Sequence, residues 1–243
     1  MHKIILVFPI LAMLFVTSCE KVPPPTGGAS LTIVNAVNGS DAFVTNFTPK
    51  NPKESASGPL QYYNTANTIY YASYWESASY IENTYLELSQ LSDTNAIFFA
   101  GNFNLPIGSV HTLYLAGDTT SLDTLYATDV IPYYPSTDSV TGVRFVNLVE
   151  HSQPISINIT GTYPDQSEFT GIAYKEISAF KTYPTTYTSP KICKFEIRDE
   201  SSGTLLRSFS WTRRPFKNQT IVIAGSEVTP SNFRVITMVV NNY

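Results

Sequence analysis

The sequence predicts an all-β protein made of two antiparallel β-sandwich domains in tandem. Three observations lead to this prediction. Charged residues make up only 14% of the chain, against about a quarter in typical soluble proteins, and polar residues that suit strands and turns replace them. Short apolar or alternating runs are separated by turn signals about every 8–12 residues. Three sequence blocks also occur twice in the same order, which indicates a duplicated domain.

The N-terminus resembles the export signal of a bacterial lipoprotein. Lys3 supplies a positive charge, residues 4–16 are uncharged, and small residues precede Cys19. The apolar stretch is in the range of about 10–14 residues that suits a signal peptide, whereas a membrane span needs about 20. We therefore expect residues 1–18 to be removed and Cys19 to carry the lipid. An ordinary cleaved signal that leaves Cys19 as a structural thiol is the alternative.

Residues 19–30 are expected to be a tether, stiff where it contains three prolines and loose at Gly27 and Gly28. Bacterial lipoproteins generally carry more than one acyl chain, so the resemblance implies stable anchoring in the membrane. The expected location is the cell envelope, in the outer membrane, on either its periplasmic or its surface face.

The duplication divides the remaining chain into residues 31–130, a proline-containing linker at 131–141, and residues 142–243. Each copy contains a strand-like block with an asparagine at its fifth position, a block with Tyr and Glu, and an apolar block that ends at glycine. The matched pairs are residues 31–36 and 143–148, 73–80 and 173–180, and 112–117 and 220–225.

The individual strands follow from period-two alternation and from flanking turn residues. Residues 73–91 fit either a bulged strand or a short helix, and we favour the strand. The other predicted strands lie at 31–36, 112–117, 143–148, 155–159, 192–198, 205–211, 220–224 and 233–240. Within 192–198 the alternation places Cys193, Phe195 and Ile197 on one face. Cys193 is therefore expected to be a buried apolar residue, with an intermolecular disulfide or a reactive thiol as the alternative.

The repeated blocks resemble the bacterial "domain of unknown function" family numbered 4397. The second copy carries the pattern apolar-Arg-Phe-Val-Asn-Leu at 143–148, Ala-Tyr-Lys-Glu-Ile-Ser at 173–178 and Thr-Ile-Val-Ile-Ala-Gly at 220–225. The first copy departs from it through an insertion at 47–69 and a Tyr-Trp-Glu step. Members of this family are secreted or lipid-anchored β-sandwich domains, often in tandem. The resemblance implies that fold and location, with immunoglobulin-like or transthyretin-like sandwiches, and it implies no reaction.

Composition and motifs exclude several functional classes. The net charge of −4 gives no basic surface for nucleic acid. His111 and His151 are the histidines beyond the signal, and neither has Cys, His or paired carboxylates at the spacing of a zinc site. No phosphate-binding loop, Gly-x-Ser-x-Gly elbow or metalloprotease helix occurs. We therefore expect no metal, no cofactor and no enzymatic activity, although a serine triad using one of these histidines stays open.

Aromatic residues are the candidate ligand-binding groups. Doubled tyrosines cannot both point inward on a strand, so some must be exposed. Tyr133, Tyr134, Trp75 and Trp211 are the residues that we select as candidates for stacking on a sugar or a protein partner.

Two further patterns have a structural and a functional interpretation. Glu76 and Glu176 recur beside tyrosines, and we favour a structural role for them over ligand or calcium binding. The tripeptides at 118–120, 123–125 and 138–140 resemble the acceptor of a bacterial O-glycosylation system.

Together these features predict a membrane-anchored envelope lipoprotein that acts as a non-enzymatic structural or protein-interaction module. Its partners would be the membrane, through the lipid on Cys19, and another envelope protein. The alternative is a glycan-binding surface lipoprotein of a nutrient-uptake system.

Overall fold

The structure is a computed structural model, and it describes residues 27–40, 42–47, 68–79, 82–226 and 234–242. The predicted signal peptide, Cys19 and the proline part of the tether lie outside these ranges. The described residues form sixteen β-strands and no helix, which confirms the predicted all-β fold. Accordingly, no helix in the described ranges is long and apolar enough to cross a membrane.

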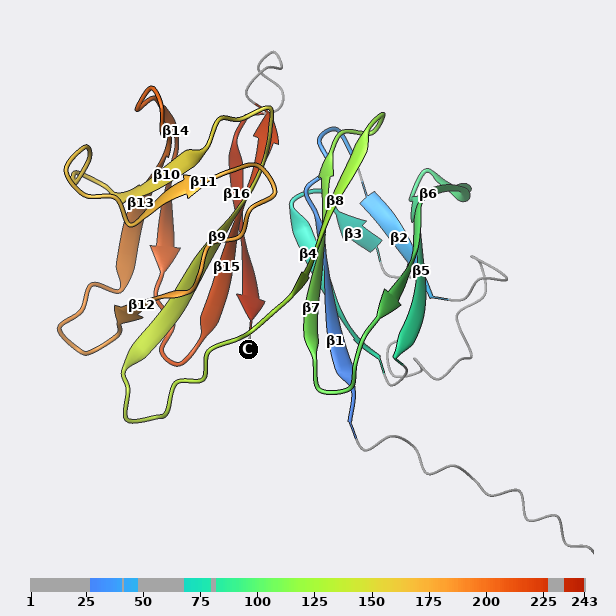
Figure 1. Cartoon of the computed structure of the whole chain (residues 1–243), viewed down its shortest axis with the longest axis horizontal. Helices are drawn as coiled ribbons and strands as arrows, with labels where there is room; N and C mark the ends of the chain where they lie inside the picture. The colour runs from blue at the N-terminus through green and yellow to red at the C-terminus, as the bar shows by residue number, and fades with distance from the viewer. Residues whose placement is uncertain (1–26, 41, 48–67, 80–81, 227–233, 243) are drawn as a thin grey trace, which may run out of the picture.

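The first copy is a sandwich of two four-stranded sheets (Figure 1). Its inner sheet has the order β4-β1-β7-β8, and its outer sheet has the order β3-β2-β5-β6. The strands are β1 (Ala29–Asn35), β2 (Ala42–Asn46), β3 (Thr68–Tyr70), β4 (Ser73–Ser79), β5 (Asn83–Gln90), β6 (Asp93–Asn104), β7 (Val110–Gly117) and β8 (Leu122–Thr128).

The second copy repeats this topology strand for strand. Its inner sheet has the order β12-β9-β15-β16 and its outer sheet has the order β11-β10-β13-β14. The strands are β9 (Val140–Glu150), β10 (Ile155–Ile159), β11 (Phe169–Ile172), β12 (Lys181–Pro184), β13 (Ile192–Asp199), β14 (Leu205–Thr212), β15 (Asn218–Ser226) and β16 (Ile236–Asn242).

The expectation of purely antiparallel sheets needs one refinement. Both outer sheets are antiparallel throughout. Each inner sheet, however, contains one parallel pair, β1 with β7 and β9 with β15. Between these two strands the chain of each copy goes to the outer sheet twice and forms the antiparallel inner edge strand, β4 or β12, between the two visits.

The asparagine repeated in the first block joins three segments of each sandwich. Asn147 Nδ2 donates to the carbonyl oxygen of Ile172 and to Ser152 Oγ, both at 3.0 Å, and Asn147 Oδ1 accepts the N–H of Val149 at 3.0 Å. In the first copy Asn35 likewise donates to the carbonyl oxygen of Ile69 and accepts the N–H of Val37, but its serine bond is reversed, because Ser40 Oγ donates to Asn35 Oδ1. Because this buried amide is fully engaged in both copies, its repetition in the sequence reflects the fold.

In the structure, each residue of the second block in the first copy corresponds to a residue three positions later in the second copy than the sequence match indicated. Ala72 and Lys175 both have positive φ, 57° and 62°. Their N–H groups donate to the carbonyls of Asn35 and Asn147, at 2.9 and 2.7 Å. Ala72 is therefore the structural counterpart of Lys175, whereas the sequence match paired Ala72 with Ile172.

This shift separates the two glutamates that the sequence had paired. Glu76 lies on β4 opposite Thr32 of β1. Glu176 lies in a turn before β12, where its Oε2 accepts the N–H of Ala173 at 2.9 Å. The two carboxylates occupy different places in their sandwiches, so their apparent repetition carries no shared role.

Each sandwich encloses its own apolar core between its two sheets. In the second copy the rings of Phe145, Phe195, Tyr183 and Trp211 pack against one another, with centroids 5.4–6.0 Å apart for the pairs centred on Phe195. Cys193 joins this core as a free, buried thiol, as its alternation predicts. The first core is mostly aliphatic, with Phe43 and Phe103 buried in it and Phe98 packed against it.

A third apolar core lies between the two inner sheets. We call this contact the seam; its buried residues are Val34, Ala36, Tyr114, Ala116, Val146, Leu148, Val222, Ala224, Met238 and Val240. The central strands of the two inner sheets, β1, β7, β9 and β15, are consequently buried on both faces over most of their length, and all nine residues of β15 are buried. The molecule is thus a stack of four sheets with three cores, rather than two separate sandwiches on a string (Figure 1).

A buried ion pair crosses the seam. Arg144 of β9 donates from its NH2 group to Asp129 Oδ1 at 2.5 Å, and the side chains are 7% and 0% exposed. Thr112 of β7 donates to the second oxygen of Asp129 at 2.6 Å, and Arg144 Nε donates to Thr220 of β15 at 2.9 Å. The guanidinium also lies 4.7 Å from the centroid of the Phe180 ring. Both charges therefore have the hydrogen-bond partners that burial demands.

The two connecting segments are more firmly held than their composition suggests. Ala29 already belongs to β1, and the carbonyl of Gly28 accepts the N–H of Gly108 at 3.0 Å, so the end of the predicted tether is docked. β9 begins at Val140, within the predicted linker. The linker itself is tied to β15, because Asn218 Nδ2 donates to the carbonyl of Pro132 at 2.7 Å.

Candidate functional site

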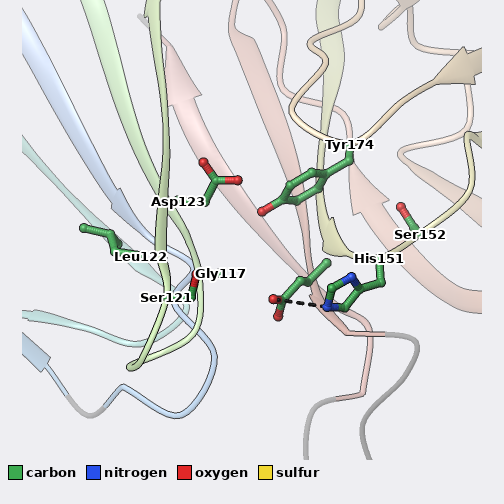
Figure 2. Close-up of a pocket in the computed structure, with 8 residues that line it drawn as sticks. Gly117, Ser121, Leu122, Asp123, His151, Ser152 and Tyr174 are labelled. Atoms are coloured by element: carbon green, nitrogen blue, oxygen red, sulfur yellow. Dashed lines mark ion pairs between the residues drawn. The ribbon is translucent and has the colours of Figure 1, made fainter.

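A polar pocket of about 590 Å³ opens at one end of the seam, between the two copies. Its walls come from the β7–β8 turn, the β9–β10 turn and the segment between β11 and β12. The lining residues are Gly117, Ser121, Leu122, Asp123, Glu150, His151, Ser152 and Tyr174. Asp123 and Tyr174 point toward each other across the space between the copies (Figure 2). This volume lies within the range of about 300–1,000 Å³ that is usual for small-ligand pockets.

The turn that forms the first wall requires a glycine. Gly117 has φ of 79°, and a Cβ there would come within 2.3 Å of the carbonyl oxygen of Ser121. Asp118 then closes the turn, because its Oδ1 accepts the hydroxyl and the N–H of Thr120 and the N–H of Ser121 at 2.7–2.8 Å. These bonds, first of all the one from the Thr120 hydroxyl, hold the pKa of Asp118 below its usual value.

The two carboxylates of the lining each face a basic side chain. Lys175 Nζ donates to Asp123 Oδ1 at 2.5 Å, which links the two copies. Burial alone would raise the pKa of Asp123, but hydrogen bonds led by that from Lys175 outweigh it, so the pKa lies below the usual value. Glu150 Oε1 lies 3.4 Å from His151 Nε2, the pair dashed in Figure 2.

The two hydroxyl groups that matter differ, because Tyr174 hydrogen-bonds to Asp123 whereas Ser152 can donate into the pocket. Burial, followed by the charge of Asp123, raises the pKa of Tyr174 well above its usual value, so its hydroxyl keeps its proton. Ser152 Oγ accepts from Asn147 at 3.0 Å, which leaves its own proton available. The pocket therefore offers carboxylate acceptors, a serine hydroxyl donor and one partly buried aromatic ring.

The structure contradicts the selection of Trp211 as an exposed ligand-binding residue. Its side chain is 1% exposed in the second core, and its Nε1 donates to Gln219 Oε1 at 2.7 Å. Trp75 lies on β4 and packs against Phe47, with ring centroids 6.2 Å apart. It is partly buried against the first core. Trp211 therefore presents no stacking face, whereas Trp75 keeps part of its surface exposed and its role stays a prediction.

The two linker tyrosines differ from each other. Tyr133 is 86% exposed, whereas Tyr134 is half-buried with its hydroxyl against β9, so that a Cβ at Gly142 would lie 2.5 Å from it. Neither residue belongs to the lining of the seam pocket. The structure thus does not bring the four predicted aromatic residues together into one platform.

The histidines also have different environments. His111 is buried in β7, where its ring stacks on Tyr126 with centroids 5.2 Å apart and its nitrogens lie 2.7 Å from Ser109 Oγ and 3.2 Å from Thr128 Oγ1. His151 is exposed and lines the seam pocket. Within the described ranges, no group of three or more His, Cys, Asp or Glu side chains is arranged to hold a metal ion.

The three O-glycosylation-like tripeptides lie in different settings. Thr119 and Thr120 are exposed on the β7–β8 turn next to the pocket, whereas Thr124 lies within β8. Ser139 lies in the linker, where its carbonyl accepts the N–H of Thr185 at 2.7 Å. Their modification stays a prediction.

Sequence reasoning did not find the seam pocket. Asp123, His151 and Tyr174 lie far apart in the chain, and they meet only because two inner sheets pack against each other. One usable signal was present: Gly117 ends an apolar run and is followed by the turn residues at 118–121. Polar residues that follow such turn positions mark the rim of a sandwich, where loops gather.

Comparison with known proteins gives no family for this chain. No protein-family model matches it, and no curated protein matches it, so the resemblance to family 4397 stays a prediction.

Three solved structures are similar to it at low identity. A streptococcal virulence factor that binds alpha-glucan is 12% identical, with 76% of this chain and 88% of that chain covered and a TM-score of 0.25. A family 26 carbohydrate-binding module of Eubacterium rectale Amy13K in complex with maltoheptaose is 10% identical, with coverages of 89% and 97% and a TM-score of 0.26. A candidate cell adhesion protein of Bacteroides eggerthii is 10% identical, with coverages of 89% and 96% and a TM-score of 0.20. These TM-scores support no argument about function.

Proposed function

We propose that this chain is a lipid-anchored envelope protein whose two fused sandwiches act as a rigid, non-enzymatic interaction module. The observation that carries the proposal is the seam. Its apolar core and the buried pair of Arg144 and Asp129 join the two copies into one body. A rigid body on a membrane tether holds its surfaces at a fixed orientation to each other, which favours partner binding because little freedom is lost on association.

The anchor is tested through Cys19. In cells fed an alkyne-tagged fatty acid, the wild-type protein should carry the tag and sediment with membranes. The Cys19→Ser variant should carry no tag and should leave the membrane fraction. A Cys193→Ser variant is the matched control and should retain both properties. Equal tagging of wild type and Cys19→Ser would contradict the anchor.

The interaction role is tested by crosslinking in intact cells, with wild type compared with a variant in which the seam is broken. A defined envelope protein should be recovered reproducibly with the wild type, confirmed by reciprocal capture, and lost when Val222→Asp separates the two copies. If recovery is the same with both forms, a rigid two-sandwich module is not what the partner recognises.

Glycan binding is the second candidate, and the seam pocket favours it. The pocket combines acceptors, donors and a ring, as a hydroxylated ligand requires. A glycan array separates the two candidates, because specific binding of the full-length protein supports the second and a blank array, with a confirmed protein partner, supports the first.

A further inference from the structure

We propose that the seam pocket binds one neutral saccharide unit, at an end of a glycan or as a free sugar. This inference rests on the second candidate function and assigns it a place and a ligand class. It starts from the charge of the lining. Asp123 is already paired with Lys175 at 2.5 Å, and Glu150 faces His151 at 3.4 Å and Asn38 Nδ2 at 3.5 Å.

This pairing argues against a charged ligand. A cation would compete with Lys175 for Asp123, and the lining has no three-ligand cluster for a metal. An anion would meet the carboxylates of Asp118, Asp123 and Glu150, which together outnumber the basic groups at this end of the seam. A neutral ligand avoids both costs.

The hydrogen-bonding groups fit vicinal hydroxyls. A carboxylate has about four lone-pair positions, so Asp123 can accept from a ligand hydroxyl while it still accepts from Lys175, from the N–H of Thr124 and from Tyr174. The Tyr174 hydroxyl donates its proton to Asp123, so it offers a ligand its oxygen as an acceptor, and the Ser152 proton is free because its oxygen already accepts from Asn147. Each hydroxyl of a sugar both donates and accepts, and the lining supplies both kinds of partner.

The ring of Tyr174 supplies the apolar contact that distinguishes a sugar from water. It is half-buried and reaches from the second copy toward Asp123 of the first (Figure 2). The C–H face of a pyranose can lie against such a ring while its hydroxyls meet Asp123. One ring accommodates one sugar unit, so we expect recognition of a single unit rather than of a long chain.

The test uses the full-length protein in a sugar-free detergent and saturation-transfer NMR. The probes are glucose, galactose, mannose, N-acetylglucosamine and maltoheptaose, with terbium luminescence as the cation probe. At least one saccharide should bind. Affinity should fall about tenfold or more in Asp123→Asn and in Tyr174→Ala. Tyr174→Phe, which keeps the ring and loses the hydroxyl, should fall between these and wild type.

The fully exposed Tyr187 provides the control, because Tyr187→Ala removes an aromatic side chain outside the pocket. It should leave affinity unchanged, and the melting temperature of every variant shows whether it is folded. Three results overturn the proposal: no saccharide binds, binding is equal in the pocket variants and wild type, or terbium binds at the pocket and is lost in Asp123→Asn. In the second case the protein still binds glycans, but at another place on the molecule. In all three cases the crosslinking experiment tests the interaction module independently.

Discussion

Arg144 and Asp129 form the most deeply buried ion pair that the structure describes, and they belong to different copies. Removing one partner leaves an uncompensated charge at the seam. We expect Arg144→Met to lower the free energy of unfolding by about 3–5 kcal/mol in chemical denaturation. The double variant Arg144→Met with Asp129→Leu should recover much of this loss, because no charge then stays buried.

Lys175→Met is the matched control for this prediction. Lys175 also joins the two copies through an ion pair with Asp123, but both side chains of this pair are about one-third exposed. Exposed pairs contribute about 0–1 kcal/mol. If Lys175→Met costs as much as Arg144→Met, burial is not what makes the seam pair important.

His111 should make stability depend on pH near neutrality. Burial lowers the pKa of this histidine, against a smaller opposing effect of Asp129. The unfolded chain, with a pKa of about 6.5, therefore takes up a proton before the folded protein does. Stability from this group is fully present above about pH 6.5 and is lost as the pH falls below it. Urea midpoints at pH 7.5 and 5.5 should differ less in His111→Gln than in wild type.

The burial of a residue could be inferred from the sequence where the alternation of its own strand determines it. Cys193 is the example, because the alternation of its strand alone indicated a buried thiol. Arg144 was visible in a repeated block, but nothing in its neighbourhood identified Asp129, because the two meet only after separate sheets form. Trp211 failed for a related reason: its exposure depends on which face of β14 packs inward.

At the scale of elements, the β7–β8 turn depends on its glycine more than other turns do. Gly117 and Gly108 both have positive φ, but a Cβ at Gly117 would strike the Ser121 carbonyl, whereas a Cβ at Gly108 would meet nothing within 4 Å. Gly108→Ala should cost only the left-handed backbone penalty, about 1–2 kcal/mol. Gly117→Ala should cost clearly more, because the turn must also shift.

Thermal unfolding of the two variants, followed by circular dichroism, checks this prediction. A lower melting temperature for Gly117→Ala than for Gly108→Ala is expected. Equal melting temperatures would mean that the turn yields freely and does not set the shape of the pocket wall.

Most strands could be predicted from sequence because alternation and turn residues are local. Predicted residues 205–211 and 192–198 fall within β14 and β13. The inner strands were identified by apolar content, but their burial on two faces was not foreseen, because a run such as 220–224 looks the same whether one or both faces are covered. The three-residue shift of the second block was missed because a positive-φ residue leaves no mark on side-chain similarity.

At the scale of the whole molecule, the seam should make the two copies unfold together. Calorimetry of the wild type is expected to show one cooperative transition. Val222 is fully buried in the seam, so Val222→Asp should lower stability and separate the transition into two. Val239→Asp on the partly exposed β16 is the control and should keep a single transition. Two transitions in the wild type would contradict a shared core.

The all-β fold class and the duplication could be predicted from the sequence, because both depend on local patterns that occur twice. The four-sheet stack and the seam pocket were not, since each depends on how two finished sandwiches meet. No repeated block by itself indicates whether two copies touch.

The seam is built from the same face of both copies. Val34 and Val146, Ala36 and Leu148, Tyr114 and Val222, and Ala116 and Ala224 are equivalent pairs under the strand registers, and all eight residues lie in its core. Such self-complementarity is the hallmark of an isologous subunit interface. Here a short docked linker joins the two partners, which replaces a bimolecular equilibrium by a high effective concentration. A dimer would dissociate on dilution, whereas this pair of sandwiches stays assembled even in a single isolated molecule.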